Sequence, residues 1–374
     1  MKRGSVAIAG IGESSSWDVA GTGLTALDLI GEATAAALED SGLSLGDVDG
    51  LFTASAYYGM PGLNVGEYLG VRPRYSDSTN LGGASFVSHL QHAAAAIDAG
   101  LCEVALIAYG STQRADGGRL KSVAEAYPWE ADHRPRYPVS QFALAAARHM
   151  HEFGTTREQL AEVAVAARGW ARQNDRAFAR DPLTVEDVLG SRMISTPLTA
   201  KDACLVTDGA GALLVTSAER AATLRRPPVL LLGGGEAHWH RNISQMPDLV
   251  RTAAAESGAR AYERAGVGPA DVDAVEVYDA FTICTILFLE DLGFCAKGEG
   301  GAFVSGGRIA PGGELPVNTN GGGLSYCHPG MYGIFVLAEA ARRIRAGDDV
   351  VLAHGNGAVL SAQSTTILGS AATA

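Results

Sequence analysis

The stretch that decides the fold is EATAAALEDSGLSLGDVDGLF (32–52), because ESGARAYERAGVGPADVDAVE (256–276) repeats it without a gap. The two copies share glutamate and glycine positions and an Asp-Val-Asp triplet, at 47–49 and at 271–273, with an offset of 224 residues. Each copy has the pattern of a helix ended by glycine, then a short loop, then an apolar strand. We predict from this repeat that the chain is a duplication.

A second pair of segments supports the duplication. AAAAIDAGLCEVALIAYG (93–110) and AEAARRIRAGDDVVLAHG (338–355) share a helix, an Ile-x-Ala-Gly stop and a strand, and differ by two residues in the loop. Apolar strands also open each half, at 6–12 and at 228–235. Alternating strands and helices predict an α/β fold with mixed or parallel sheets covered on both faces.

The repeats predict two fused halves, at 1–222 and 223–374. Within the first half, residues 113–190 hold charged, aromatic, proline-rich and helical stretches that do not belong to the repeated plan. We interpret this segment as a lid-like insertion over the functional site. Dimer-contact or surface decoration is an equally open interpretation.

Composition limits the class of protein. With 374 residues, 47% hydrophobic and 19% charged, the chain is a packed globular protein, and its net charge of −12 disfavours nucleic acid as a partner. The five cysteines form no CxxC pair and predict free thiols in a reducing, cytoplasmic compartment. We expect no signal peptide and no membrane span, because no run approaches ~18 apolar residues.

Three motifs carry a resemblance to a known family. They are PLTAKDACLVTDGAGALLV (197–215), VEVYDAFT (275–282) and VNTNGGGLSYCHPGMYG (317–333). With the duplication and the central insertion, they resemble the thiolase superfamily, and in particular its sterol-carrier-protein and lipid-transfer-protein thiolases, over essentially the whole chain. The resemblance implies a duplicated five-layer αβαβα thiolase fold that acts on CoA thioesters without a permanently bound cofactor. It also implies a homodimer paired through edge strands and a small partner subunit with an OB-fold and a zinc ribbon.

The chain departs from that family at its nucleophile. Counting back from Gly100 by the family's spacing places Gly83 where the family has its nucleophilic cysteine. The second motif has Tyr278 where the family supplies asparagine or histidine, and the third motif keeps His328. The family's last cysteine falls near His354, so its role is either vacant or passes to this histidine as a second acid/base group; a packed imidazole is the alternative for His354.

These departures change the expected chemistry. A glycine cannot form an acyl-enzyme, whereas retro-aldol cleavage of a β-hydroxyacyl-CoA needs only a base and donors for the thioester enolate. The pattern resembles the cysteine-less lipid-transfer-protein aldolases that shorten CoA-activated steroid side chains, although those enzymes usually have tyrosine where this chain has His328. We therefore predict a carbon–carbon lyase for a branched, steroid-side-chain-like β-hydroxyacyl-CoA. An acyltransferase or thiolase with a non-standard nucleophile such as Cys327, and a non-catalytic acyl-CoA-binding subunit, are the alternatives.

The expected roles are distributed as follows. Tyr278, His328 and His354 are the candidate catalytic residues, although a phenol titrates near pH ~10 and needs a lowered pKa or a relay to act as a base. Gly82 and Gly83 could supply oxyanion amides at a helix N-terminus, or simply turn the chain. The other expected substrate contacts are Asn318, Gly322, Tyr326 and Cys327. His238 and His240 lack a third ligand, so no metal site is predicted.

Overall fold

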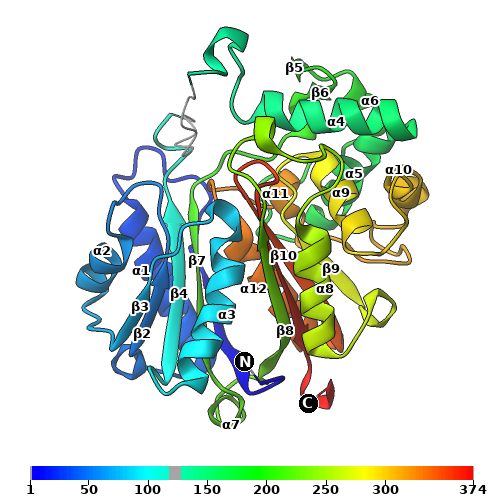
Figure 1. Cartoon of the computed structure of the whole chain (residues 1–374). Coiled ribbons are helices and arrows are strands. Elements are labelled where there is room, and N and C mark those ends of the chain that lie inside the picture. Colours follow the sequence, from blue (N-terminus) through cyan, green and yellow to red (C-terminus); the bar gives the residue numbers. More distant parts are fainter. Residues whose placement is uncertain (1, 118–127, 374) are drawn as a thin grey trace.

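One mixed nine-stranded sheet runs through the computed structural model, which describes residues 2–117 and 128–373 (Figure 1). The strand order is β3-β2-β4-β7-β1-β8-β11-β10-β9. The strands are β1 (Val6–Glu13), β2 (Gly50–Thr53), β3 (Tyr75–Asp77), β4 (Val104–Ser111), β7 (Gly209–Ser217), β8 (Val229–His238), β9 (Ala274–Val277), β10 (Val350–Gly357) and β11 (Ala362–Gly369).

The sheet consists of two equivalent halves. In the first, β1, β7 and β4 are antiparallel in turn and β4 is parallel to β2; in the second, β8, β11, β10 and β9 repeat these relations. The halves join where β1 pairs with β8. The counterpart of β3 is a single parallel bridge between Val275 and Val317. The matching topology agrees with the duplication predicted from the repeats.

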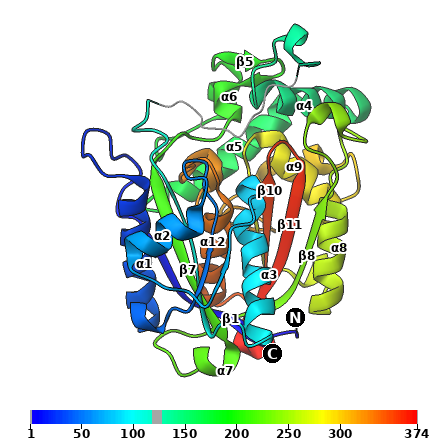
Figure 2. The ribbon, with the colours of Figure 1, turned by 60° about the vertical axis from the view of Figure 1, so that its left-hand side comes forward.

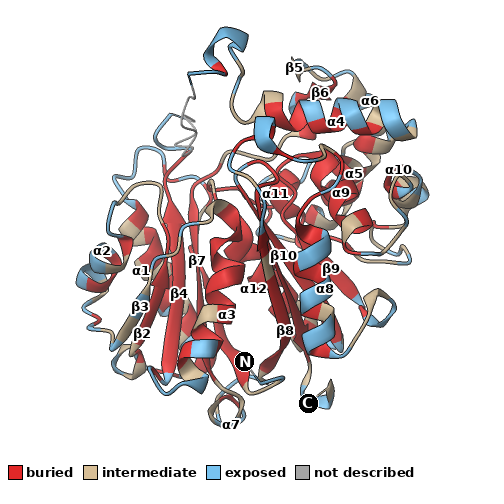
Figure 3. Cartoon of the chain, viewed as in Figure 1, coloured by how far each residue is buried: buried red, intermediate tan, exposed pale blue. Residues whose placement is uncertain are grey.

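Helices complete five layers. They are α1 (Ala26–Ser41), α2 (Pro61–Leu69), α3 (Ser85–Asp98), α7 (Ala218–Ala221), α8 (Ala254–Ala265) and α12 (Gly333–Ala346). Helices α3 and α12 lie between the two halves of the sheet and each contacts strands of both, whereas α1 and α8 cover the outer faces (Figures 1 and 2). Figure 3 shows most strands of the sheet and most of α3 as buried, whereas the edge strand β3 is partly exposed. The predicted αβαβα thiolase fold is confirmed.

The repeated Asp-Val-Asp triplet has a structural cause. The last aspartate of the first triplet, Asp49, accepts hydrogen bonds from the backbone amides at 103–104, where β4 begins. Its counterpart Asp273 accepts from the amides at 349–350, where β10 begins. Each carboxylate thereby satisfies amides at the start of the parallel neighbour strand and holds the two strands in register.

The segment between β4 and β7 lies over one end of the sheets (Figure 1). Its elements are α4 (Val139–Phe153), α5 (Arg157–Ala171), α6 (Val185–Leu189), β5 (Met193–Ser195) and β6 (Leu198–Thr199), and it packs on α9 (Thr282–Asp291), α10 (Gly300–Val304) and α11 (Gly322–Ser325) of the second half. Buried His149 contacts Glu290 at 3.0 Å, and Lys297 contacts the same carboxylate at 2.9 Å. The contact between His149 and Glu290 joins α4 to α9, and Lys297, which follows α9, supplies the positive charge that compensates the buried carboxylate.

Part of the predicted lid, residues 118–127, lies outside the described residues. Its role as a lid and the boundary at 222/223 stay predictions. The five cysteines are all free thiols, as the sequence predicts. Within residues 2–117 and 128–373, no helix is both long and apolar enough to cross a membrane.

Candidate active site

A tyrosine and a histidine from two of the motifs form the centre of the candidate site. Tyr278 directly follows β9, and its hydroxyl lies 2.7 Å from Nε2 of His328, in the turn after α11. The same hydroxyl lies 3.2 Å from the carbonyl oxygen of Gly330. The backbone amide of His328 donates to Oγ1 of Thr207, which lies in the motif 197–215, at 2.9 Å. All three sequence motifs therefore meet at this pair.

Burial determines the charge of both groups. Burial raises the pKa of Tyr278 well above 10 and lowers the pKa of His328 to about 4. At neutral pH the phenol is therefore protonated and the imidazole is neutral. In the tautomer with hydrogen on Nδ1, His328 Nε2 accepts the phenol proton. The pair can relay a proton without carrying a net charge at rest.

The Tyr278 ring occupies the space in front of Gly83. This glycine lies in a short 3-10 helix (Gly82–Ala84) immediately before α3, at the position predicted for the family's nucleophile. A Cβ atom on Gly83 would lie 1.8 Å from Cε1 of Tyr278 and 2.7 Å from the carbonyl oxygen of Asn356. No side chain fits there while the tyrosine is in place. The Tyr278 ring and a side chain at position 83 would therefore occupy the same space, so the two cannot be present together in this arrangement.

The remaining cysteines are poor substitutes for that nucleophile. Cys327, next to His328, is fully buried, and burial raises its pKa well above 9. Burial also raises the pKa values of Cys204 and Cys284. Because the thiolate is the reactive form, these thiols stay protonated and weakly nucleophilic at neutral pH.

The predicted oxyanion amides are partly occupied. The Gly82 amide donates to Asn80 Oδ1 at 3.1 Å, and the Gly322 amide donates to Asn320 Oδ1 at 2.8 Å. Gly322 needs to be glycine for packing, since a Cβ there would lie 2.1 Å from a carboxylate oxygen of Asp279. The amides of Gly82 and Gly322 are therefore engaged within the protein. The oxyanion role of Gly82 and Gly83 and the substrate contact of Gly322 stay predictions.

His354 lies in the core on β10. Its Nδ1 is 2.8 Å from Thr365 Oγ1, its Nε2 is 2.9 Å from Gln363 Oε1, and its side chain is fully buried. Burial lowers its pKa to about 4. Both ring nitrogens are occupied, so acid/base catalysis would require one of these hydrogen bonds to break. Only its backbone carbonyl touches the central pair, by accepting from the Tyr278 amide at 3.0 Å.

Asn318 and Tyr326, two of the predicted substrate contacts, make hydrogen bonds within the protein. Asn318 has a left-handed backbone (φ 53°), and its Oδ1 accepts from the Val277 amide at 2.8 Å at the end of β9. Tyr326 is buried and donates to Glu13 at 2.6 Å. Tyr326 also lines a cavity of about 400 Å³ beside α5 and α12. In this arrangement both side chains position the turns that carry Tyr278 and His328.

The sequence did not indicate Gln113, two residues after β4. Its side chain is only 2% exposed and lies against Gly330, the residue whose carbonyl faces Tyr278. The neighbouring Tyr109 donates to the Pro329 carbonyl at 2.5 Å. No local pattern marks either residue, because their proximity to the His328 turn arises only when the two halves pack together.

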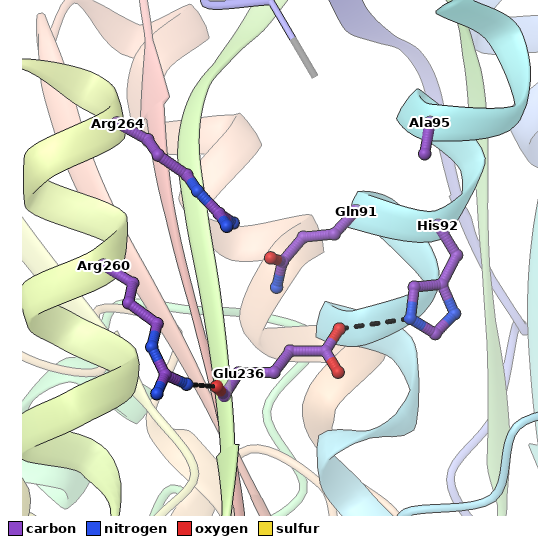
Figure 4. A pocket seen from close by; sticks show the side chains of 6 residues that line it. All are labelled: Gln91, His92, Ala95, Glu236, Arg260 and Arg264. Atoms are coloured by element: carbon purple, nitrogen blue, oxygen red, sulfur yellow. Dashed lines mark hydrogen bonds and ion pairs between the residues drawn. The ribbon is translucent and has the colours of Figure 1, made fainter. Parts of the chain in front are cut away.

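A cavity of about 580 Å³ lies elsewhere, between α3, β8 and α8 (Figure 4). Its lining residues are Gln91, His92, Ala95, Glu236, Arg260 and Arg264. His92 connects the two halves of the chain, with Nδ1 2.7 Å from Asp77 Oδ2 and Nε2 3.2 Å from Glu236 Oε1. The hydrogen bond to Glu236 raises the pKa of His92 to about 9, against the opposing effect of burial.

This ion bridge predicts a pH-dependent stability. Because the pKa of His92 is higher in the folded than in the unfolded protein, its contribution is complete below pH ~6.5 and is lost as pH rises toward about 9. We expect the free energy of unfolding to fall by about 1–2 kcal/mol over that range, after allowance for solvent screening. Urea unfolding at pH 6 and pH 9 measures it, and His92→Gln should flatten the dependence. Exposed His151→Gln should leave it unchanged; a dependence that survives in His92→Gln would contradict the assignment.

No cluster of three metal-ligating side chains occurs among the residues that the structure describes. His238 lies 3.5 Å from Glu236, and His240 lies 3.1 Å from the carbonyl oxygen of Val359. The two histidines thus contact different groups.

The fold and the site define a thiolase-type protein in which a tyrosine ring fills the space at Gly83, the position predicted for the nucleophile. A family profile described as Thiolase C-terminal domain-like matches residues 235–370. The steroid side-chain-cleaving aldolase of Thermomonospora curvata is 35% identical over 91% of this chain and 90% of its own length. The chain belongs to the thiolase superfamily, in its aldolase-like branch.

Two further comparisons agree. The 17-hydroxy-3-oxo-4-pregnene-20-carboxyl-CoA lyase of Mycobacterium tuberculosis is 35% identical, with 92% of each chain covered. A solved structure described as the Ltp2-ChsH2(DUF35) aldolase is 32% identical, covers 99% of both chains and superposes with a TM-score of 0.89. Family and fold are therefore supported over nearly the whole length.

Proposed function

We propose that the protein cleaves a branched β-hydroxyacyl-CoA by a retro-aldol reaction that forms no acyl-enzyme. The observation that carries this proposal is the Tyr278 ring in the volume next to Gly83, which excludes a thiol nucleophile and places a phenol there instead. The names of the two relatives, an aldolase and a CoA lyase, support the same reaction class. Their steroid substrates support a bulky, steroid-side-chain-like acyl group.

The pair supplies the proton transfers. Tyr278 Oη accepts the β-hydroxyl proton while its own proton moves to Nε2 of His328, 2.7 Å away. The β-hydroxyl becomes a carbonyl as the bond between the α- and β-carbons breaks, and the bonding electrons remain on the α-carbon as a thioester enolate. The proton then returns along the same path to the α-carbon. The products are a ketone and a shortened acyl-CoA.

Burial makes the relay suitable for this reaction. An imidazolium is costly at His328, where burial lowers the pKa to about 4, unless an anion forms beside it. The enolate is such an anion, so the two charges appear and disappear together. The relay therefore favours the step that creates the enolate over protonation from bulk solvent. His354 and Asn318 act in this proposal by holding β9 and β10 in place.

An acyltransferase reaction through Cys327 is the alternative to be tested. We expect intact-protein mass spectrometry with acetoacetyl-CoA and acetyl-CoA to show no acyl adduct, because the Cys327 thiol is buried and protonated. In parallel, a branched β-hydroxyacyl-CoA should yield a ketone and a short acyl-CoA with both the wild type and Cys327→Ala. An adduct that disappears in Cys327→Ala would overturn the lyase proposal.

We also propose two assemblies for this chain. The structure named Ltp2-ChsH2(DUF35) supports a DUF35-type partner subunit for this chain. Strand β3 is at one end of the sheet, and an unpaired strand edge supports the predicted homodimer. Light scattering of the purified chain tests the homodimer directly. Activity assays with and without a DUF35-type subunit test whether the partner is required.

A further inference from the structure

Gln113 presents a buried carboxamide oxygen that has no hydrogen-bond partner among the described residues. Its side chain is 2% exposed. The amide lies flat against Gly330: a Cβ on that glycine would lie 3.1 Å from Oε1 and 3.2 Å from Nε2. Because Tyr278 contacts the carbonyl of the same glycine at 3.2 Å, the amide and the phenol flank one residue.

A second unsatisfied atom lies on the same turn. Nδ1 of His328 is buried and makes no hydrogen bond of normal geometry within the described residues, although the backbone of Leu205 lies close enough to oppose the lowering of the ring's pKa by burial. Twelve buried side-chain polar atoms lack a hydrogen-bond partner among the described residues, and two of them lie at the turn 328–330. A ligand with oxygen atoms would supply the missing partners. The pattern marks this turn as a place where substrate binds.

We propose that Gln113 binds the oxygen on the β-carbon of the acyl chain, and so selects β-oxygenated acyl-CoA thioesters over saturated ones. The inference rests on the proposed function, in which this oxygen begins as a hydroxyl and ends as a carbonyl. A carboxamide suits both states, because it offers a donor and an acceptor side by side. A hydroxyl can use either, and a carbonyl can accept from Nε2. The amide therefore holds the oxygen while Tyr278 exchanges its proton.

The chemistry of the neighbouring groups favours this assignment over a purely structural amide. A structural glutamine is expected to bond to the protein, as Gln91 does on α3, where Nε2 donates to Ser364 Oγ at 3.0 Å. Gln113 has the same side chain in a similarly buried place, and its Oε1 has no partner among the described residues. Sites that bond a substrate oxygen reject the analogue that lacks it, because the buried polar group is then left unpaired.

The test compares two four-carbon thioesters that differ in the β-oxygen, acetoacetyl-CoA and butyryl-CoA, by calorimetric titration of the full chain. The wild type should bind acetoacetyl-CoA more tightly by a factor of about 5–50. Gln113→Leu should abolish this preference by weakening acetoacetyl-CoA alone. Gln113→Met provides a second amide-free side chain if the leucine variant does not fold. Gln91→Leu, the same change at the bonded glutamine, should keep the preference.

Different outcomes separate this inference from the proposed function. If the Gln113 variants keep the wild-type preference, or if the wild type has none, the role of Gln113 is overturned while cleavage of a β-hydroxyacyl-CoA can still be observed. If the preference depends on Gln113 but no β-hydroxyacyl-CoA is cleaved, the binding role stands and the lyase proposal fails. If the wild type binds neither thioester and cleaves nothing, both are overturned.

Discussion

Replacing Tyr278 with phenylalanine is expected to lower kcat for cleavage of a β-hydroxyacyl-CoA by a factor of about 10²–10⁴, the range typical for loss of one general acid/base group. The ring would still pack against Gly83, so the change removes only the hydroxyl that contacts His328 Nε2 and the Gly330 carbonyl. Stability should fall by about 1–3 kcal/mol, because one buried nitrogen loses its partner. Steady-state kinetics and urea unfolding measure the two effects separately.

Tyr332→Phe is the matched control. Its phenol is also buried but donates to Asn320 Oδ1 at 3.0 Å, outside the catalytic pair. It should lose stability to a similar extent and keep most of its activity. Equal losses of kcat in Tyr278→Phe and Tyr332→Phe would show that the Tyr278 hydroxyl is structural.

For the wild type, kcat/KM should fall below a pH of about 4. The imidazole of His328, whose pKa is about 4, takes up a proton there and can no longer accept one from Tyr278.

Gly83→Ala is expected to destabilise the fold by about 1–3 kcal/mol or more and to abolish activity, because the new methyl group would overlap the Tyr278 ring at 1.8 Å. The ring cannot stay in place, so its hydroxyl also leaves His328. Gly59→Ala is the control, since nothing lies within 4 Å of a Cβ there. We expect that control to change the free energy of unfolding by less than about 1 kcal/mol.

A double-mutant cycle isolates the steric contact. In a Tyr278→Ala background the ring is absent, and only the Asn356 carbonyl at 2.7 Å still crowds the new methyl group. Gly83→Ala should therefore cost clearly less free energy in that background than in the wild type. Additive effects of the two substitutions would contradict the conclusion that the two positions compete for one volume.

The duplication could be predicted from the sequence because short local segments repeat in both halves. The offset of 224 residues relates β2 (Gly50–Thr53) to β9 (Ala274–Val277), and the Asp-Val-Asp triplets mark hydrogen bonds that recur in both halves. By contrast, β7 and β11 have no matching sequence pattern, although they occupy equivalent places in the sheet. The sequence comparison of the halves therefore missed them.

The site was predictable only in part. The motifs identified Tyr278 and His328, and counting along the chain identified Gly83, but their contacts arise from packing between segments far apart in the sequence. Sequence alone could not show that the Tyr278 ring fills the space at Gly83. Neither a tyrosine after a strand nor a glycine before a helix is unusual, and nothing in either segment indicates that the two lie in contact. It also could not show that both nitrogens of His354 are occupied or that Oε1 of Gln113 lacks a partner among the described residues, since those facts depend on neighbours from other strands.

The shared volume at positions 83 and 278 restricts how such a site can evolve. A chain with a cysteine at 83 cannot accept the tyrosine at 278, since the two side chains would overlap. Loss of the side chain at 83 has to come first, and the resulting form has neither thiol nor phenol. Any stepwise exchange of one side chain for the other therefore passes through a form that has neither the thiol nor the phenol.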